Sequence, residues 1–304
     1  MKISVIIPAY NEDKSIMGCI DSILKNSYVH KEIIVINDCS TDNILRKLEN
    51  IKDVIIINNE NKLGIVGSIK KGIEKSKGDI IIKLNADCIV EGDFLKKSAK
   101  HFEIHEVVAI TGNYKPLNKT WITDSLAIID DFFLNISQRK LSLSKLSGPF
   151  WAARKETLLK LSLWSKNKVN DEGNIYLEIK DYGPVIYDSS MIIKGTFPDS
   201  FGGVLARKFK WGVNSIHDHY FKHMLFWIRP LYFLIAILIF SPNNLISILA
   251  LSITMLPLIT LFCFSLFKYP FLSFFIPFIF IFSEFAWLCG TINALVKKVN
   301  GILR

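Results

Sequence analysis

The sequence predicts an α/β domain with a mainly parallel, Rossmann-like sheet, followed by a membrane region. Over the first hundred residues, short β-branched runs alternate with segments whose apolar residues recur at helical spacing. Such alternation is typical of βαβ units and therefore of a parallel sheet. Between residues 230 and 296 the chain is almost wholly apolar, and its charged side chains there are Lys268 and Glu284.

The predicted elements of the α/β domain follow one another at short intervals. Near-continuous apolar runs predict buried strands over residues 3–7, 32–36, 54–57 and 79–84. Helical spacing predicts helices over residues 13–25, 42–49, 64–75 and 120–139. The later part is less regular: residues 147–160 read as a loop or strand entering a helix, and residues 172–181 as a further helix.

Composition divides the chain into three predicted parts. We expect residues 1–200 to form a cytosolic α/β domain, residues 201–224 amphipathic basic helices at the membrane interface, and residues 225–304 the membrane region. The apolar segments span residues 225–240, 245–267 and 271–296. The last two exceed the roughly 20 residues that cross a bilayer, and the first is marginal. Cations before and after this region both favour the cytosol, which needs an even number of crossings, so two and three crossings both stay open.

The charge and cysteine content narrow the class of protein. The net charge is +9, and the cations gather beside the apolar segments, which favours binding to anionic lipid headgroups. No nucleic-acid-binding motif is present, so we expect no nucleic-acid partner. The five cysteines lack zinc-site or paired spacing, and the amino terminus lacks the long apolar core of a signal peptide. We therefore expect a multi-pass membrane protein whose α/β domain faces the cytosol.

Polar residues follow the predicted strands. The first strand is followed by PAYNE (residues 8–12), the second ends in NDCSTD (37–42), and the fourth ends in NAD (85–87). Neither GxGxxG nor GxxxxGK[ST] occurs, which disfavours a dinucleotide dehydrogenase and a P-loop ATPase. This edge presents carboxylates instead, and carboxylates bind a diphosphate only through a divalent cation. Mg²⁺ or Mn²⁺ suits that task because it takes carboxylate and phosphate oxygens together.

These segments resemble the signature of the family 2 glycosyltransferases, whose nucleotide-binding domain has the GT-A fold. The opening IIPAYNE, then INDCSTD and GDIIIKLNAD, match in order and spacing. GPFWAARKETL is similar to the family's acceptor-side segment, DEGNIYLEIKDYG to its ED-containing helix, and RKFKW to its QxxRW motif. The resemblance covers about the first 215 residues, and membrane helices at the carboxyl end fit many members.

The resemblance implies a nucleotide-sugar pocket. It assigns Pro8, Tyr10 and Glu12 to the nucleoside, and it places Asp38 where a carboxylate accepts a hydrogen bond from a uracil-like base. A UDP-sugar is therefore the expected donor. An ordinary strand-end turn is the alternative for Pro8 and Tyr10, and a helix cap is the alternative for Asp38.

The metal site implied by the resemblance departs from the family pattern. Asp87 matches the final carboxylate of the DxD motif and is the expected metal ligand, whereas Asn85 replaces the first carboxylate. Asn85 can offer a neutral oxygen to metal or diphosphate but supplies no charge. The site is therefore predicted to carry less negative charge than the family's site. We expect Asn85→Asp to tighten Mn²⁺-dependent donor binding. Donor binding should then depend more on Asp38 and on cations such as Lys210; surface-turn roles are the alternative for Asn85 and Asp87.

Two further segments carry residues implied by the resemblance. Asp171 and Glu172 align with the family's ED pair, and Glu172 is the expected base that removes the acceptor proton. Acids that merely favour a helix start are the alternative. In RKFKW, Lys210 and Trp211 are expected on the acceptor and diphosphate side; a basic helix at the headgroup level stays open as a second interpretation.

The expected function is inverting transfer of a sugar from a nucleotide-sugar, with a UDP-sugar preferred, to a lipid-linked or polyprenyl-phosphate acceptor. A processive polysaccharide synthase with a glycan acceptor is the first alternative. It would need a channel, which three short segments could form only in a homo-oligomer. A non-catalytic nucleotide-sugar-binding membrane protein is the second alternative.

Overall fold

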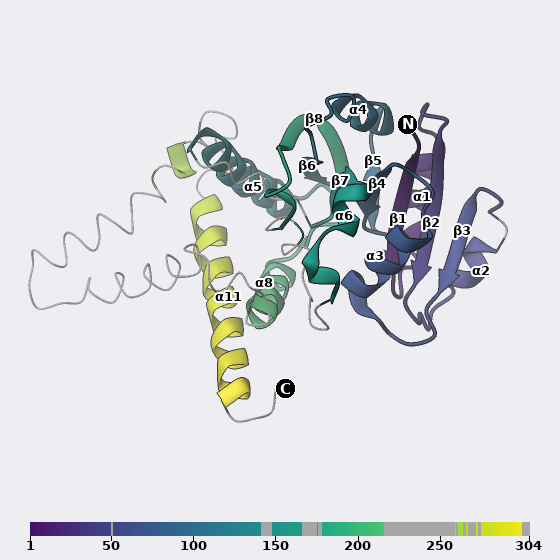
Figure 1. Cartoon of the computed structure of the whole chain (residues 1–304). Coiled ribbons are helices and arrows are strands. Elements are labelled where there is room, and N and C mark those ends of the chain that lie inside the picture. Colours follow the sequence, from purple (N-terminus) through teal and green to yellow (C-terminus); the bar gives the residue numbers. More distant parts are fainter. Residues whose placement is uncertain are drawn as a thin grey trace, which may run out of the picture. The chain divides into compact units, whose positions relative to one another are not determined.

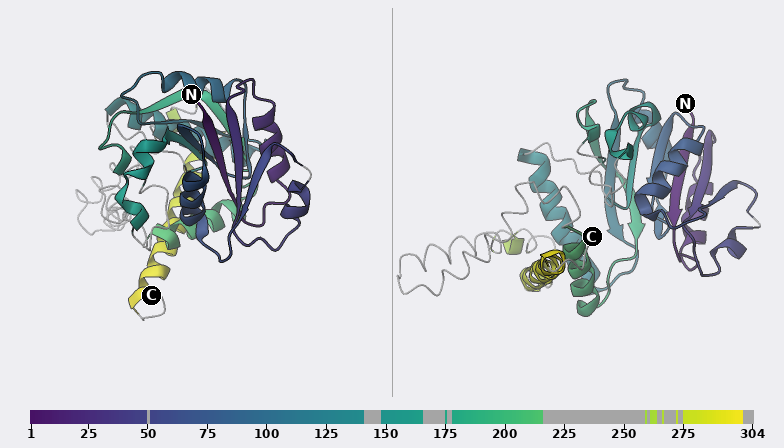
Figure 2. Two further views of the ribbon diagram at one scale, coloured as in Figure 1. Left: turned by 45° about the vertical axis from the view of Figure 1, so that its right-hand side comes forward. Right: turned by 60° about the horizontal axis from the view of Figure 1, so that its bottom comes forward.

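The computed structural model describes residues 1–49, 51–140, 148–165, 175, 178–215, 259, 261–263, 266, 272 and 275–299. The chain divides into two compact units, which are described separately (Figures 1 and 2). The sheet unit comprises residues 1–117 and 143–196, and the helical unit comprises residues 118–142 and 197–304.

The sheet unit is built on an eight-stranded sheet with the order β3-β2-β1-β4-β7-β6-β8-β5. Its strands are β1 (Ile3–Ala9), β2 (Lys31–Asn37), β3 (Val54–Asn58), β4 (Ile80–Leu84), β5 (Cys88–Val90), β6 (Ala109–Pro116), β7 (Phe150–Arg154) and β8 (Val185–Gly195). The four buried strands predicted from the sequence are β1 to β4, and all of them are present and mutually parallel. β7 falls within residues 147–160, which were predicted as a loop or strand entering a helix.

The prediction of a mainly parallel sheet is confirmed only for this first half. β7 pairs antiparallel with both β4 and β6, and β5 pairs antiparallel with β8, whereas β6 and β8 are parallel. The sheet is therefore mixed. Parallel neighbours such as β1 and β2 are joined by one helical crossover, whereas β5 and β6 lie between β4 and β7 in the chain, so no such crossover sets the direction of β7 against β4.

Helices cover both faces of the sheet (Figure 1). They are α1 (Ile16–Leu24), α2 (Ile44–Leu48), α3 (Gly64–Lys75), α4 (Phe94–His101) and α6 (Lys155–Leu159), with a 3₁₀ turn at Ser162–Ser165. Side chains alternate across β1, so Val5 and Ile7 pack with α1, α2 and α4, while Ile6 packs with α3 and α6. A strand covered on both faces reads as a continuous apolar run, which is why β1 was predictable.

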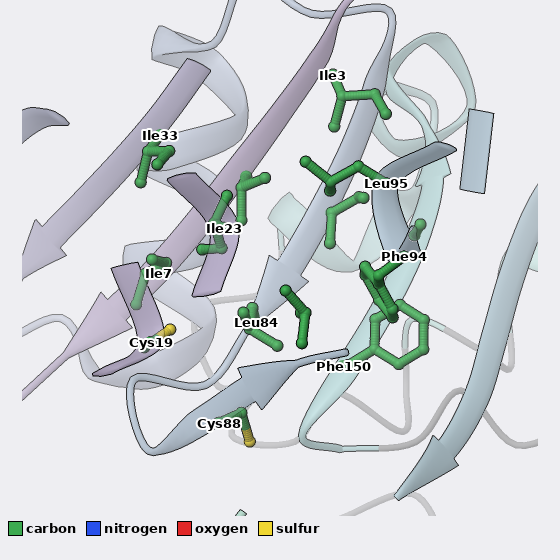
Figure 3. Packing of buried hydrophobic residues seen from close by; sticks show 14 of the residues in the cluster. Ile3, Ile7, Cys19, Ile23, Ile33, Leu84, Cys88, Phe94, Leu95 and Phe150 are labelled. Atoms are coloured by element: carbon green, nitrogen blue, oxygen red, sulfur yellow. The ribbon is translucent and has the colours of Figure 1, made fainter. Parts of the chain in front are cut away.

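The core on the α1 and α4 face extends along the central strands (Figure 3). Ile23 from α1 packs over β1, and Phe94 from α4 meets Phe150 of β7 with ring centroids 4.8 Å apart. Each large side chain buried here stabilises the fold by roughly 1.5–3 kcal/mol. This packing makes the sheet a rigid support for the loops at the carboxyl ends of β1, β2 and β4.

The helical unit contains three described long helices. These are α5 (Trp121–Lys140), α8 (Phe201–Ser215) and α11 (Ile276–Val299). α5 corresponds to the helix predicted over residues 120–139, and Ile128 and Ile129 of α5 share a buried cluster with Ile276 and Ile279 of α11.

Within the described residues, α11 alone is long and apolar enough to cross a membrane, with a mean hydropathy of 1.4 over Ile276–Asn293. Part of that window, 41 %, is buried inside the protein, and core helices of soluble proteins also meet this criterion. The apolar segment at residues 225–240 lies outside the described residues, as does most of residues 245–267. Several crossings therefore stay a prediction.

Helices α8 and α11 approach each other at two glycines. A Cβ on Gly212 would lie 2.0 Å from the carbonyl oxygen of Trp287, and one on Gly290 would lie 2.1 Å from that of Phe209. Thr291 Oγ1 donates to the Gly212 carbonyl oxygen at 3.2 Å. Only the missing side chains allow the two backbones to come this close.

The same contact gives Glu284 a partner that the sequence did not reveal. Lys208 Nζ lies 3.4 Å from Glu284 Oε1, and both side chains are mostly buried. A carboxylate inside an apolar helix is costly unless it is paired. The second residue of RKFKW therefore holds α11, so part of that motif is structural.

We predict that Gly212→Ala lowers the free energy of unfolding by about 1–3 kcal/mol, because the added methyl group overpacks the contact with α11. The measurement is thermal unfolding of the detergent-purified full chain. Gly202→Ala is the matched control on the same helix, since a Cβ there meets nothing within 4 Å. Equal melting temperatures for both variants would contradict the close approach.

Candidate active site

The predicted binding residues meet at the carboxyl ends of β1, β2 and β4. They line one pocket of about 230 Å³, together with Gly64, Ile65 and Ser68 from α3. The predicted residues in this pocket are Pro8, Tyr10, Glu12, Asp38, Asn85 and Asp87. Ligands of open α/β sheets bind at this edge. Parallel strands bring their carboxyl ends together, which is why segments some 75 residues apart in the sequence share one pocket.

Two residues with a left-handed backbone conformation shape the loops that carry these side chains. Asn11, just after Tyr10, has a φ of 56°, and Cys39, just after Asp38, has a φ of 61°. Such conformations are uncommon outside glycine and cluster at functional sites. Asn11 Oδ1 accepts a hydrogen bond from the Thr41 backbone N–H at 2.8 Å, so the two loops are joined side by side.

Asp38 is buried, and its carboxylate has the capping role that was the alternative to base binding; the contact with a base stays a prediction. Its Oδ1 accepts hydrogen bonds from Asn59 Nδ2 and from the Leu63 backbone N–H, and its Oδ2 accepts one from the Gly64 backbone N–H, all at 2.8 Å. Asp38 therefore caps the start of α3, a distant helix and not the one that follows it in the sequence. An ionised carboxylate has about four acceptor positions, so one on Oδ2 is left for a ligand donor.

We predict that Asp38→Ala destabilises the protein even without donor. Loss of the carboxylate removes the acceptor of the Leu63 and Gly64 N–H groups at the start of α3 and one of the two acceptors of Asn59 Nδ2, and loss of a helix cap costs about 0.5–2 kcal/mol. Thermal unfolding of the donor-free protein measures this. A variant that kept its stability but lost nucleotide binding would instead show that Asp38 acts on the ligand alone.

Tyr10 and Glu12 face the pocket from the loop after β1. The Tyr10 ring is 43 % exposed, and Lys62 Nζ lies 3.4 Å above its centroid, a cation–π contact that adds a positive charge to this side. Burial raises the pKa of the Glu12 carboxyl, and the nearby charges of Asp87 and Asp42 raise it further. A hydrogen bond from Ser15 Oγ at 2.6 Å partly offsets these effects.

The NAD segment after β4 carries the residues expected at the diphosphate. Asp87 Oδ1 lies 3.6 Å from Cys88 Sγ, whose pKa is raised by burial, so the group facing the carboxylate is a neutral thiol. Asn85 Oδ1 accepts a hydrogen bond from Lys83 Nζ at 2.6 Å. The amide oxygen that was expected to face a metal or diphosphate is thus engaged by a lysine. The sequence signal for Lys83 was a lone cation in the apolar strand IIIKL.

The residues present fit a divalent cation held jointly with a ligand. Among the described residues, no group of three or more His, Cys, Asp or Glu side chains could hold a metal. Mg²⁺, however, is commonly bound by one or two carboxylates together with substrate phosphates. Asp87 supplies one carboxylate, and its charge is already among the causes that raise the pKa of Glu12. A cation near Asp87 would relieve that repulsion.

The remaining predicted residues are Asp171, Glu172, Lys210 and Trp211. Asp171 and Glu172 fall outside the described residues, although Ile175 and Ile179 shortly after them are fully buried in the sheet unit. Lys210 and Trp211 lie on α8 in the helical unit. The ring of Trp211 is flanked by Arg207, whose guanidinium carbon lies 4.7 Å from its centroid.

An α/β domain with a carboxylate-lined pocket at the strand ends is the architecture of nucleotide-sugar-dependent transferases, and the family comparison agrees. Residues 4–161 match the profile of glycosyl transferase family 2. The chain belongs to this family and is a glycosyltransferase. The alternative of a non-catalytic binding protein is therefore not supported.

Relatives in sequence are synthases of a bacterial polysaccharide. The poly-beta-1,6-N-acetyl-D-glucosamine synthase of Staphylococcus aureus (strain COL) is 25% identical over 267 residues, covering 84% of this chain and 63% of the relative. The synthase of Staphylococcus epidermidis is 24% identical over 220 residues, covering 69% of this chain and 53% of the relative. This chain thus spans less than two thirds of the relatives' length.

Solved structures share the fold at low identity. The mannosyltransferase PcManGT from Pyrobaculum calidifontis, in complex with GDP-Man and Mn²⁺, is 15% identical with a TM-score of 0.63, over 97% of this chain and 87% of that one. S. aureus TarS 1–349 in complex with UDP is 15% identical with a TM-score of 0.51, over 99% and 92%. These likenesses identify the fold as GT-A.

Proposed function

We propose that this protein is a membrane-bound inverting glycosyltransferase that moves a sugar from a UDP-sugar to a lipid-linked or polyprenyl-phosphate acceptor. One observation carries the proposal: the residues assigned to the donor line a single pocket at the carboxyl ends of β1, β2 and β4. The UDP complex of TarS supports a uridine donor, and the acceptor position left on Asp38 Oδ2 suits the N–H donor of a base such as uracil.

In this proposal Asp87 holds Mg²⁺ or Mn²⁺ at the diphosphate, with Glu12 close by. When bound, the cation neutralises negative charge on the departing diphosphate. Two relatives in fold, PcManGT and GalNAc-T7, were solved with Mn²⁺, which supports such a site. Tyr10 and Pro8 form the wall against the nucleoside, and Lys62 adds a positive charge beside Tyr10.

Glu172 acts as the base in this scheme. With a lipid-linked acceptor that reacts through a hydroxyl group, it accepts the hydroxyl proton while the new bond forms on the face of the sugar opposite the leaving diphosphate. A polyprenyl phosphate reacts through an ionised oxygen and does not need this base. Asp171 adjoins Glu172, and Lys210 and Trp211 contact the acceptor or diphosphate. The segments at residues 201–224 and 225–304 would keep the domain at the cytosolic membrane surface, where a lipid-linked acceptor presents its head group.

The test uses the purified full chain in detergent with Mn²⁺, labelled UDP-sugars and polyprenyl phosphate. We expect label to move from the aqueous to the lipid-soluble fraction with one of the UDP-sugars. Transfer from GDP-sugars alone would overturn the uridine part of the proposal. Absence of lipid-soluble product with every donor would overturn the acceptor part.

A second candidate function is polysaccharide synthesis, and the named relatives favour it. The RKFKW helix resembles a motif associated with chain-elongating synthases. Sizing of the product separates the two functions: single transfer gives one added sugar per acceptor, and a synthase gives long chains from the same donor.

A further inference from the structure

Lys83 is a fully buried lysine in the centre of the sheet, at the base of the candidate active site. It lies on β4, the strand that ends immediately before Asn85, and its side chain has no solvent exposure. Burying an ammonium group is costly unless hydrogen bonds compensate. Lys83 Nζ donates to Asn85 Oδ1 at 2.6 Å and to the Gly148 carbonyl oxygen.

The contact with Lys83 determines how Asn85 is oriented. An ammonium group only donates hydrogen bonds, so the Asn85 atom that faces it must be the carboxamide oxygen. The amide nitrogen then points away from Lys83. Asn85 is part-exposed and lines the pocket, and no described residue accepts a hydrogen bond from its Nδ2. Asn85 therefore presents a donor to the pocket, whereas the sequence suggested an acceptor.

Asn85 and Lys83 also make the site less negative. Relative to a pair of carboxylates at positions 85 and 87, the amide at Asn85 removes one negative charge and Lys83 adds one positive charge. A phosphate oxygen is the ligand that suits an N–H donor polarised by a buried cation. For a divalent cation, in contrast, Asp87 is the only charged ligand within residues 85–87.

We propose that Lys83 and Asn85 form a built-in phosphate-binding pair, in which Lys83 orients and polarises the Asn85 amide so that its Nδ2 donates to a phosphate oxygen of the nucleoside diphosphate. The pair binds a phosphate group that a metal would otherwise bind at this position. Lys83 is a positioning residue, and Asn85 touches the ligand. This inference rests on the proposed function, since it requires a nucleotide donor in the pocket.

The test is a titration of UDP into the full chain, with GDP as second probe, in EDTA and in Mn²⁺. We expect wild type to bind UDP in EDTA and Lys83→Met to bind it about tenfold or more weakly there, with Mn²⁺ recovering most of the loss. Lys75→Met, on the exposed end of α3, removes a cation away from the pocket and should bind as wild type does. Circular dichroism and thermal unfolding show whether each variant folds.

Substitutions of Asn85 keep the proposal testable if Lys83→Met does not fold. Asn85→Ala retains the cation but removes the donor, and it should weaken UDP binding in EDTA by about tenfold. In Mn²⁺, Asn85→Asp alone should bind UDP only slightly more tightly than wild type does, because Lys83 pairs with the new carboxylate. The double variant Lys83→Met with Asn85→Asp should bind UDP only in Mn²⁺.

The outcomes separate this inference from the function on which it rests. If wild type binds UDP only in Mn²⁺, or if Lys83→Met and Asn85→Ala both fold and bind UDP in EDTA as tightly as wild type, the phosphate-binding pair is wrong while the glycosyltransferase proposal stands. If wild type binds neither UDP nor GDP even in Mn²⁺, the proposed donor site itself is wrong.

Discussion

Asp87→Ala is expected to lower sugar transfer by about 10²–10³-fold, the scale of losing one group that stabilises transition-state charge. Asp87 lies in the donor pocket at the end of β4 and is the charged ligand available to a metal on that segment. Without it, the cation that balances the leaving diphosphate is held only weakly. The measurement is the rate of transfer at saturating donor across a range of Mn²⁺ concentrations.

Two comparisons make this result specific to the site. Asp53→Ala removes a carboxylate from an exposed turn of the same unit and should leave the rate unchanged. The melting temperature of donor-free Asp87→Ala should not fall, because removal of its charge relieves repulsion with Glu12. Transfer at the wild-type rate by a folded Asp87→Ala protein would rule out a metal-binding role.

Glu172→Gln is expected to reduce transfer to a hydroxyl acceptor by about 10²–10⁴-fold, the usual contribution of a positioned general base. Glutamine keeps the shape of the side chain but cannot accept the acceptor proton. UDP binding should stay as in wild type, because the nucleotide residues belong to β1, β2 and β4. Single-turnover transfer together with a UDP titration separates the two effects.

The neighbouring acids serve as controls for Glu172. Glu178 Oε2 accepts hydrogen bonds from the Ser162 and Leu163 backbone N–H groups at 2.6 and 3.2 Å, so its carboxylate is a structural acceptor. Substitution of Glu178 should therefore lower stability. Asp181→Asn, at an exposed position, should change neither property. A Glu172→Gln protein that transfers at the rate of Asp181→Asn would show that the base lies elsewhere.

Much of the sheet unit was predictable because its signals are local. A strand covered on both faces must be apolar along its length, and β1, β2 and β4 were recognised in this way. The apolar run of β3 was also recognised, although β3 lies at the edge of the sheet and Ile55 is exposed. In the antiparallel half, β7 and α6 fall where a loop or strand entering a helix was predicted, over residues 147–160. The other strands were not recognised, since β5 is short and β6 and β8 are partly exposed. Direction within a sheet also depends on connections that residue patterns do not encode.

The sequence by itself determined the family and predicted the residues that line the pocket, while the lower charge of the metal site stays a prediction. Those conclusions depend on residue identity and order: PAYNE, NDCSTD and NAD each follow a strand, and parallel strands end at one edge. Only the tertiary structure decided what each side chain does there. Asp38 caps α3 through the Leu63 and Gly64 N–H groups, and Lys83 turns the Asn85 amide towards the pocket. Hydrogen bonds are directional and join atoms distant in sequence, so residue order alone does not determine them.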